Sequence, residues 1–514
     1  MSSNALQLQR LLKRFFLVLV TTVILTFYIL QFKSSGLVTN TGKNPWDLYD
    51  FSNIPSDKER LNETTVGNDV KNYIHSLPVE YWKTRDTRAD KNVCGGIGSI
   101  YDIKFSNNFW QILNHSNGTF HFLNAYYDNR TKSVVPTVRV IATVNRLNPK
   151  HSITCQMWLD QAVHPVFAPV TEFKYMWLTA WGVQTEAYQQ PYLISCDIPK
   201  TYQNATPLAV SLVERKCDKA TNLLKVHNKK PFSGEKDNFA VCVKGLSFQY
   251  NDQSVILIEW LEYLFSMGVS KVFIYVLHVH ANMWKVLQYY DSIGKIEVRR
   301  HALSGNYPNI PGFQQDFLSK RVSSKRLEEL IPYNDCFYDN MNLYKFIALL
   351  DIDELIVPKG HLMTWKELQN FLEPSLKHSP EDLDGYGFRN VFFHDGNETY
   401  DGIPSYLRFT NIIKRNRDHH KVGQATKSWF STENVQTLHN HYSFNLLSPD
   451  KKSRYKKWHE VDPNVAQMQH YCFNKKCDPT NVTLDNTLWK YKDRVVEESL
   501  KVLESLQFIS KKEG

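Results

Sequence analysis

The chain has 514 residues, of which 42% are hydrophobic and 22% are charged. These fractions are ordinary for a folded protein, and they exclude a disordered chain, a collagen-like chain and a polytopic membrane protein. The length is sufficient for two or three domains, and the net charge of +9 is spread too evenly to indicate a nucleic-acid partner.

The first element in chain order is an apolar run without charge over residues 15–32. A helix of that length spans roughly 27 Å, which is close to the hydrocarbon core of a thin bilayer. Arg10, Lys13 and Arg14 precede the run, so the positive-inside rule predicts a cytosolic tail over residues 1–14 and a lumenal remainder. A cleaved signal peptide is the alternative, but the run is long for one and no A-x-A cleavage site follows.

Two further features agree with a lumenal body. Asn-x-Ser/Thr glycosylation sequons begin at seven positions, namely Asn62, Asn114, Asn117, Asn129, Asn204, Asn397 and Asn481. The eight cysteines are an even number, as disulfide pairing requires, and they are Cys94, Cys155, Cys196, Cys217, Cys242, Cys336, Cys472 and Cys477. Four precede residue 235 and four follow it, so each half can close its own bridges, and the spacing of the last two favours a short local disulfide.

Residues 33–90 are rich in Asn, Asp, Ser and Lys and show no sustained period, which predicts a stem. Residues 91–232 contain short β-type runs separated by Asn-rich turns, for example over 119–127 and 133–144. This pattern predicts a small β-rich module.

The pattern changes from residue 233 to about residue 500, where strands alternate with helices. Strands are expected over 240–244, 271–277, 295–299 and 346–350, and helices over 254–267, 284–290 and about 313–345. Gly268 is placed to terminate the first helix. The alternation predicts an α/β domain with a doubly wound sheet, in which ligands bind beyond the carboxyl ends of the strands.

Asp351 and Asp353 follow the last of these strands directly. Two carboxylates with this spacing share one face of an extended segment and can hold one hard divalent cation. A cation held in this way can neutralise a diphosphate as it leaves a sugar. The alternative is an ordinary polar strand end, but the preceding buried-strand pattern favours the cation site.

Several motifs resemble those of glycosyltransferase family 92. They lie between about residues 240 and 475, and their order and spacing make the resemblance specific. They are Val241-Cys-Val, Glu259-Trp260, the run from Gly268 to Tyr275, Tyr289-Tyr290, Gly294-Lys-Ile-Glu-Val298, Asn334-Asp335-Cys336, the run FIALLDIDELIVP from Phe346 to Pro358, Lys427-Ser428 fourteen residues before His441, and Gln469-His470-Tyr471. The resemblance says little about residues 33–230.

The resemblance implies a type II membrane glycosyltransferase of the Golgi with a GT-A fold, a nucleotide-sugar donor and a divalent metal, commonly manganese. Characterised relatives transfer galactose from UDP-galactose, with inversion, to fucose on N-glycan cores, so the expected partners are a UDP-sugar and a glycan acceptor on a glycoprotein. Asp351 and Asp353 match the family's metal and nucleotide-sugar motif. His441 matches a late histidine that is a third metal ligand or a phosphate contact, and His439 beside it competes for that role. Cys472 stands where relatives often carry Arg.

Three other carboxylates are candidates for the site. Glu259 is a candidate donor contact, and Glu354 is a candidate for orienting Asp353 or the donor sugar. An inverting transfer needs a base for the acceptor hydroxyl. Asp395, after an expected strand over 387–393, is the named candidate, although the sequon at Asn397 would crowd an acceptor there. Glu398 and Glu433 remain open as alternatives.

Two other function classes remain open. A lumenal glycan-binding or adhesion protein on a degenerate transferase fold would bind no nucleotide sugar. A glycosidase would use Asp351 and Asp353 as an acid–base pair, but glycosidase carboxyls usually come from separate elements about 5–10 Å apart.

Overall fold

The structure is a computed structural model. It describes residues 13–26, 76–79, 94–96, 102–147, 149, 152–162, 164–178, 188–396, 398–447, 457–473 and 481–510. The chain divides into two units, residues 1–62 and residues 63–514.

In the first unit, residues 13–26 form a helix that covers the start of the expected anchor, and residues 27–32 lie outside the described part. Within the described ranges, no helix combines the length and the apolar character needed to cross a membrane. The anchor over residues 15–32 and the tail over residues 1–14 therefore stay predictions. Of the expected stem, only residues 76–79 are described.

The second unit begins with a β-rich module. Its strands are β1 (Gln111–His115), β2 (Gly118–Asp128), β3 (Thr137–Val144), β4 (Thr154–Leu159), β5 (Val166–Tyr175), β6 (Gln190–Asp197), β7 (Pro207–Val213) and β8 (Leu224–His227). They form one sheet in the order β1-β2-β3-β6-β5-β4-β7-β8, and β8 also pairs with β2, so the sheet curls and closes on itself. Apolar side chains such as Phe120, Phe122 and Val140 fill its interior.

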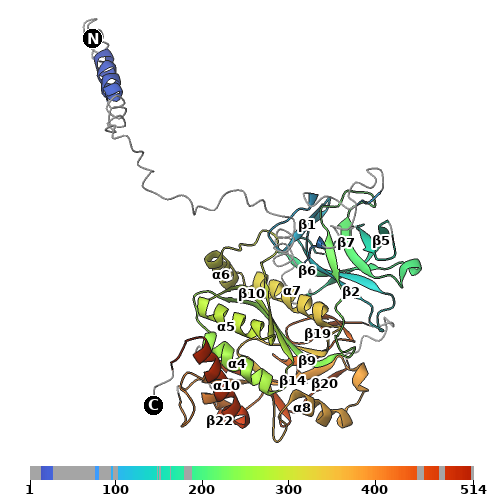
Figure 1. Ribbon diagram of the computed structural model, residues 1–514, viewed down its shortest axis with the longest axis vertical. Helices are drawn as coiled ribbons and strands as arrows, with labels where there is room; N and C mark the ends of the chain where they lie inside the picture. The colour runs from blue at the N-terminus through green and yellow to red at the C-terminus, as the bar shows by residue number, and fades with distance from the viewer. Residues whose placement is uncertain are drawn as a thin grey trace, which may run out of the picture. The chain divides into compact units, whose positions relative to one another are not determined.

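The α/β part follows, with a seven-stranded sheet in the order β11-β10-β9-β12-β17-β14-β20 (Figure 1). Its strands are β9 (Asp237–Phe248), β10 (Lys271–Val279), β11 (Ile296–Arg300), β12 (Tyr344–Leu349), β14 (Gly385–Phe388), β17 (Lys427–Ser431) and β20 (Trp458–Glu460). The first four strands of that order are parallel, whereas β17 is antiparallel to β12 and to β14. The sheet expected to be doubly wound is therefore parallel over four strands, with antiparallel pairing at β17.

Helices α4 (Ser254–Ser266), α5 (Ala281–Ser292), α6 (Pro311–Lys320) and α7 (Val322–Asn340) connect the parallel strands. Gly268 adopts a positive φ of 83° just after α4, as expected for a helix terminator. The helical stretch expected over about 313–345 is present as α6 and α7, with a break at Arg321 and an end at Asn340, before β12.

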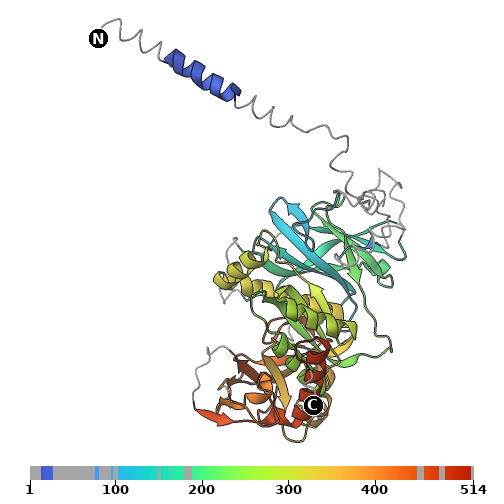
Figure 2. The same cartoon turned by 60° about the vertical axis from the view of Figure 1, so that its left-hand side comes forward.

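A second, five-stranded sheet has the order β13-β21-β15-β16-β22. Its strands are β13 (Glu354–Pro358), β15 (Asn390–His394), β16 (Lys414–Asn416), β21 (Ala466–Cys472) and β22 (Val482–Leu484). The remaining elements are the β18 (Val435–Leu438) and β19 (Ser443–Leu446) pair and the helices α8 (Trp365–Leu372), α9 (Arg408–Asn411) and α10 (Lys492–Ser505). Figure 2 shows the module and the orange-to-red C-terminal segment at opposite ends of the second unit, with the parallel sheet between them.

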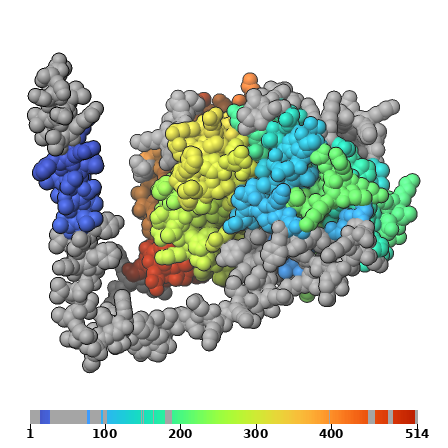
Figure 3. All heavy atoms as spheres, turned by 90° about the horizontal axis from the view of Figure 1, so that it is seen from above, coloured from blue at the N-terminus to red at the C-terminus, as the bar shows by residue number. Residues whose placement is uncertain are grey.

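The module and the α/β part share one apolar core. Trp110, Leu123 and Ile141 of the module pack in the same cluster as Phe273 and Ile347 of the α/β sheet. Figure 3 shows α6 and α7, in yellow, directly beside the blue-to-green strands of the module. The two parts are therefore not separate globules.

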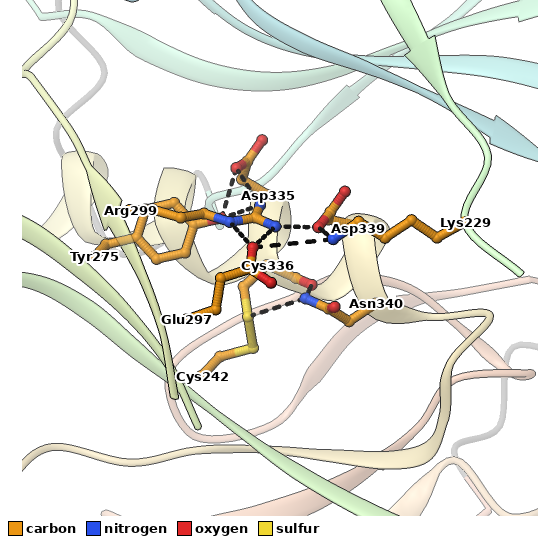
Figure 4. The surroundings of a disulfide bond; sticks show 9 residues. All are labelled: Lys229, Cys242, Tyr275, Glu297, Arg299, Asp335, Cys336, Asp339 and Asn340. Atoms are coloured by element: carbon orange, nitrogen blue, oxygen red, sulfur yellow. Dashed lines mark hydrogen bonds and ion pairs between the residues drawn. A yellow bond between two sulfur atoms is a disulfide. The ribbon is translucent and has the colours of Figure 1, made fainter. Parts of the chain in front are cut away.

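Polar contacts reinforce this junction. Asp335 on α7 accepts hydrogen bonds from Asn124 and Tyr126 of the module, at 2.8 and 2.6 Å, and from Tyr275 of β10 at 2.6 Å. Figure 4 shows the Arg299 guanidinium between Asp335 and Asp339. Asp335 and Asp339 are buried, whereas Asn124 and Arg299 are partly buried.

Disulfides lie within each half of the chain, as the cysteine positions predict. They join Cys94 to Cys217, Cys155 to Cys196, and Cys242 to Cys336. The last of these ties β9 to α7 next to the Arg299 cluster (Figure 4). Cys472 is also disulfide-bonded, and Cys477, its expected partner, lies outside the described residues.

Candidate active site

The acidic loop, residues 350–353, lies between β12 and β13 at the carboxyl edge of the parallel strands. Asp351 and Asp353 line a cavity of about 250 Å³, together with Lys244 and Ser247 from β9 and Glu329 from α7. The two aspartates therefore face a hollow at a strand end, which is where the sequence pattern predicts a ligand.

The Asp351 carboxylate is held by cationic and hydroxyl groups. Lys244 Nζ lies 3.2 Å from each of its oxygens, Lys427 Nζ lies 3.8 Å away, and the Tyr333 hydroxyl donates to it at 3.3 Å. Burial alone would raise the pKa of Asp351, but the two ammonium groups outweigh burial and hold that pKa below its usual range. Asp351 is thus ionised and already charge-balanced by the protein.

Glu354 lies beneath the loop and anchors it. Its side chain is only 4% exposed, and it accepts a hydrogen bond from the Asp351 amide at 2.9 Å and pairs with Lys427 at 2.9 Å. Burial raises the pKa of Glu354, and Lys427 opposes this rise only in part. Of the two roles expected for Glu354, this geometry favours orienting the aspartates over contact with the donor sugar.

Asp353 is the more accessible aspartate, with 39% of its side chain exposed. His470 Nε2 lies 3.6 Å from its carboxylate, and His470 Nδ1 lies 3.6 Å from Glu354. Burial alone would lower the pKa of His470, but the surrounding carboxylates outweigh burial and raise it. His470 reaches the site because β21 pairs with β13 in a register that sets it opposite Glu354.

His441 lies at the same side of the site as Lys427. Its Nδ1 is 3.1 Å from the Thr426 carbonyl, and Lys427 donates to the neighbouring Asn440 at 2.7 Å. Burial lowers the pKa of His441 to about 4, while the charge of Asp351 acts in the opposite direction. His439 instead packs against the Tyr442 and Trp177 rings.

A metal site with three protein ligands is not preformed here. Over the described ranges, no group of three His, Cys, Asp or Glu side chains is positioned to hold an ion. Asp353 and His470 form a pair of suitable donor type, and their ligand atoms lie close enough to share one cation. The donor types of this pair suit a divalent cation that takes its other ligands from outside the protein.

Comparison with known proteins decides the family. The model of glycosyltransferase family 92 matches residues 237–504. The chain belongs to glycosyltransferase family 92. The match contains β9, the acidic loop, His441 and His470, so this family 92 enzyme is a glycosyltransferase. The β-rich module lies outside the match.

Other comparisons add nothing to that assignment. TarS from S. aureus, residues 1–349, is 10% identical with a TM-score of 0.24, over 52% of this chain and 72% of that one. Ferredoxin-NADP+ reductase from Plasmodium falciparum with 2'P-AMP is 9% identical with a TM-score of 0.11, over 45% of this chain and 95% of that one. Scores this low carry no argument about fold or function. No curated protein matches the chain.

Glu259 lies outside the cavity of the acidic loop. Its buried carboxylate accepts hydrogen bonds from the Phe409 and Thr410 amides, at 2.9 and 2.7 Å, at the start of α9. Burial raises the pKa of Glu259 to about 7, although these hydrogen bonds lower it. Glu259 is not among the residues that line the cavity of the acidic loop, so its expected donor contact has no counterpart in this geometry.

Asp395 follows β15, which pairs with β21 so that Phe392 lies beside His470. Asp395 therefore lies two strands away from β13, which corresponds to about 10 Å at the ordinary spacing between strands. Its carboxylate forms an ion pair with Arg408, which also donates to the Phe473 carbonyl. The sequence pattern places one strand over 387–393, whereas the structure breaks it at Arg389 into β14 and β15, which belong to different sheets.

The two alternative candidates for the catalytic base form ion pairs with other side chains. Glu398 pairs with Lys414 and accepts from the Tyr400 hydroxyl, and Glu433 pairs with Lys236. Asn397, whose sequon would crowd an acceptor, lies outside the described residues.

Proposed function

We propose that this family 92 enzyme transfers galactose from UDP-galactose, with inversion, to a glycan acceptor on glycoproteins, and that it uses a divalent metal, manganese being the expected ion. The observation that carries this proposal is the acidic loop facing the cavity at the carboxyl ends of β9 and β12. The parallel order β11-β10-β9-β12 supports the GT-A-like fold that the family resemblance implies.

The residues in and around the acidic loop have separate roles in the proposal. Asp353 and His470 hold the cation, and His441 is the other candidate histidine. A divalent cation there supplies charge neutralisation to the departing diphosphate. Lys244 lies in the same cavity and offers a positive charge to the phosphates, while Asp351 keeps Lys244 in place. Lys427 and Glu354 hold the loop from below.

The acceptor hydroxyl must lose its proton as it attacks the sugar carbon from the face opposite the leaving diphosphate. Asp395 is the proposed base, and its carboxylate forms an ion pair with Arg408. In this scheme the new bond forms between the acceptor oxygen and the sugar carbon as the bond to the diphosphate breaks.

Two features of the structure support a lumenal location, which would suit this choice of substrates. The sequon asparagines within the described residues, namely Asn114, Asn117, Asn129, Asn204 and Asn481, are all exposed. The disulfides are typical of an oxidising compartment. We propose a type II membrane protein of the Golgi with residues 33–514 in the lumen.

The test is a panel of nucleotide sugars offered to the purified protein with MnCl₂ or with EDTA, and scored on an N-glycan array. We expect transfer of galactose from UDP-galactose in manganese and none in EDTA. Transfer from another nucleotide sugar would show that the donor is not UDP-galactose. Hydrolysis of a glycoside without any nucleotide would contradict the proposal.

A further inference from the structure

A second cavity of about 530 Å³ adjoins that of the acidic loop. One wall comes from the α/β part, with His278, Trp284 and Arg300. Another part of its lining comes from the β-rich module, with Asn107 and Phe109. The family match starts at residue 237, so it assigns no role to these module residues.

The two cavities are neighbours because Leu277 and His301 line both of them. The cavity of the acidic loop, at about 250 Å³, is smaller than the roughly 300–1,000 Å³ usual for small-molecule sites. A nucleotide sugar that places its diphosphate at Asp353 therefore needs further room, and the adjoining cavity provides it.

His301 marks the boundary between the cavities. It is only 7% exposed, and its Nε2 has no hydrogen-bond partner within the part of the chain that the structure describes. Buried polar atoms in proteins are normally hydrogen-bonded. A polar ligand that spans both cavities would supply one with a small shift of the ring.

The module also fixes the segment that carries His301. The Trp110 indole donates to the Ala302 carbonyl at 2.8 Å, and the Asn107 amide donates to the Leu303 carbonyl at 3.0 Å. Trp110 is completely buried, so its position is set by the core that both parts share. Leu303 lines the cavity of the acidic loop, so the module holds a wall of that cavity.

Aromatic rings give the second cavity its chemistry. Phe109 and Trp284 are both partly exposed, and the Arg300 guanidinium lies 5.1 Å from the centre of the Trp284 ring. Flat apolar faces beside a cationic group suit the base and ribose of a nucleotide.

We propose that the β-rich module is part of the donor site: Phe109 forms a wall against the nucleoside of the nucleotide sugar, and Asn107 and Trp110 position the 301–303 segment. This inference rests on the proposed function. Phe109 is a binding residue in this scheme, and Asn107 and Trp110 are positioning residues.

The test measures UDP binding to the full chain by calorimetry in MnCl₂, together with the KM for UDP-galactose. Phe109→Ala removes the wall, and Trp110→Phe removes the indole N–H together with part of the buried ring. We expect each change to weaken UDP binding and raise the donor KM about three- to tenfold, as for the loss of one modest contact, with kcat nearly unchanged. Phe109→Tyr should restore binding.

Lys132→Ala is the matched control. Lys132 also joins the module to the α/β part, through Asp382 at 3.2 Å, but it lines neither cavity. Its loss should leave UDP binding unchanged. If the wild-type protein binds UDP and the Phe109 and Trp110 variants bind it equally well, the module has no part in the donor site and the proposed function is unaffected. A wild-type protein that binds no nucleotide overturns both.

A second measurement needs no variant. Photolabelling of the wild-type protein with 5-azido-UDP-glucose, followed by peptide mapping, should modify the 107–109 segment. Labels confined to residues 237–504 would contradict a module wall.

Discussion

The Lys427 ammonium lies 2.9 Å from a carboxylate oxygen of Glu354, and the side chains are only 1% and 4% exposed. Lys427 also reaches Asp351 at 3.8 Å and donates to Asn440, the neighbour of His441. One buried cation therefore connects the acidic loop to the loop between β18 and β19, which carries His441.

Replacement of Lys427 by Met should destabilise the protein strongly. The change leaves the buried Glu354 carboxylate without its cation, which typically costs about 3–5 kcal/mol. Urea unfolding measures the loss, with the exposed Lys421→Met as the control. Addition of Glu354→Gln should recover part of the stability, and an unfolding free energy equal to that of the wild type would contradict the role of Lys427.

Replacement of Asp353 by Asn should abolish transfer without unfolding the protein. Asp353 and its ion-pair partner His470 are both partly exposed, whereas the proposed cation depends on Asp353. We expect at least about a 100-fold fall in kcat, since a bound cation contributes several kcal/mol to such a transition state. Asp401→Asn, at an exposed site, serves as the control. Normal activity of the Asp353 variant would remove the metal from the proposal.

The two candidate histidines can be separated by their manganese requirement. His470 lies 3.6 Å from Asp353, so His470→Ala should raise the manganese concentration for half-maximal transfer about 10- to 100-fold. His441→Ala should raise it much less. The reverse order would restore His441 as the metal ligand that the sequence predicts.

The stability of the module should depend on pH through Asp128. Burial would raise the pKa of Asp128, but Arg130 and Arg139 outweigh it and lower that pKa to about 2. Because the folded-state pKa lies below the unfolded value, the stabilisation is present above about pH 4 and is lost as the pH falls toward 2.

This contribution amounts to about 2 kcal/mol. Urea unfolding between pH 2 and pH 7 should therefore show a larger difference between the wild type and Asp128→Asn at pH 7 than at pH 2. Asp316→Asn, at an exposed site on α6, should show no such trend. A constant difference across this range would rule out Asp128 as the source.

Loss of the Cys242–Cys336 disulfide should destabilise the α/β part. The bond closes a loop of 94 residues, and removal of a native disulfide typically costs about 2–5 kcal/mol. The Cys242→Ala, Cys336→Ala double variant should show a lower melting temperature by calorimetry. An unchanged melting temperature would show that the surrounding Arg299 cluster suffices.

The local elements and the acidic loop could be predicted from the sequence. The apolar face of 254–267 and the glycine after it determine α4, and the apolar run before Asp351 determines β12. These signals lie within short segments, where periodicity and terminators act directly.

The partners of the acidic loop could not be predicted in the same way. His470 reaches Glu354 only through the antiparallel register of β21 with β13, and Lys244 reaches Asp351 only because β9 and β12 are neighbours. Such pairings join segments about a hundred residues apart, and no local pattern encodes them. His470 nevertheless lies within a motif shared with the family, which is a signal that could have identified it.

The shared core of Trp110, Leu123 and Ile141 with Phe273 and Ile347 has a consequence for how the chain can be divided. A fragment cut at the start of the family match would expose the large apolar side chains that the module now covers. We therefore expect the smallest piece able to fold on its own to begin before residue 237, so that the start of the family match is not a boundary of folding.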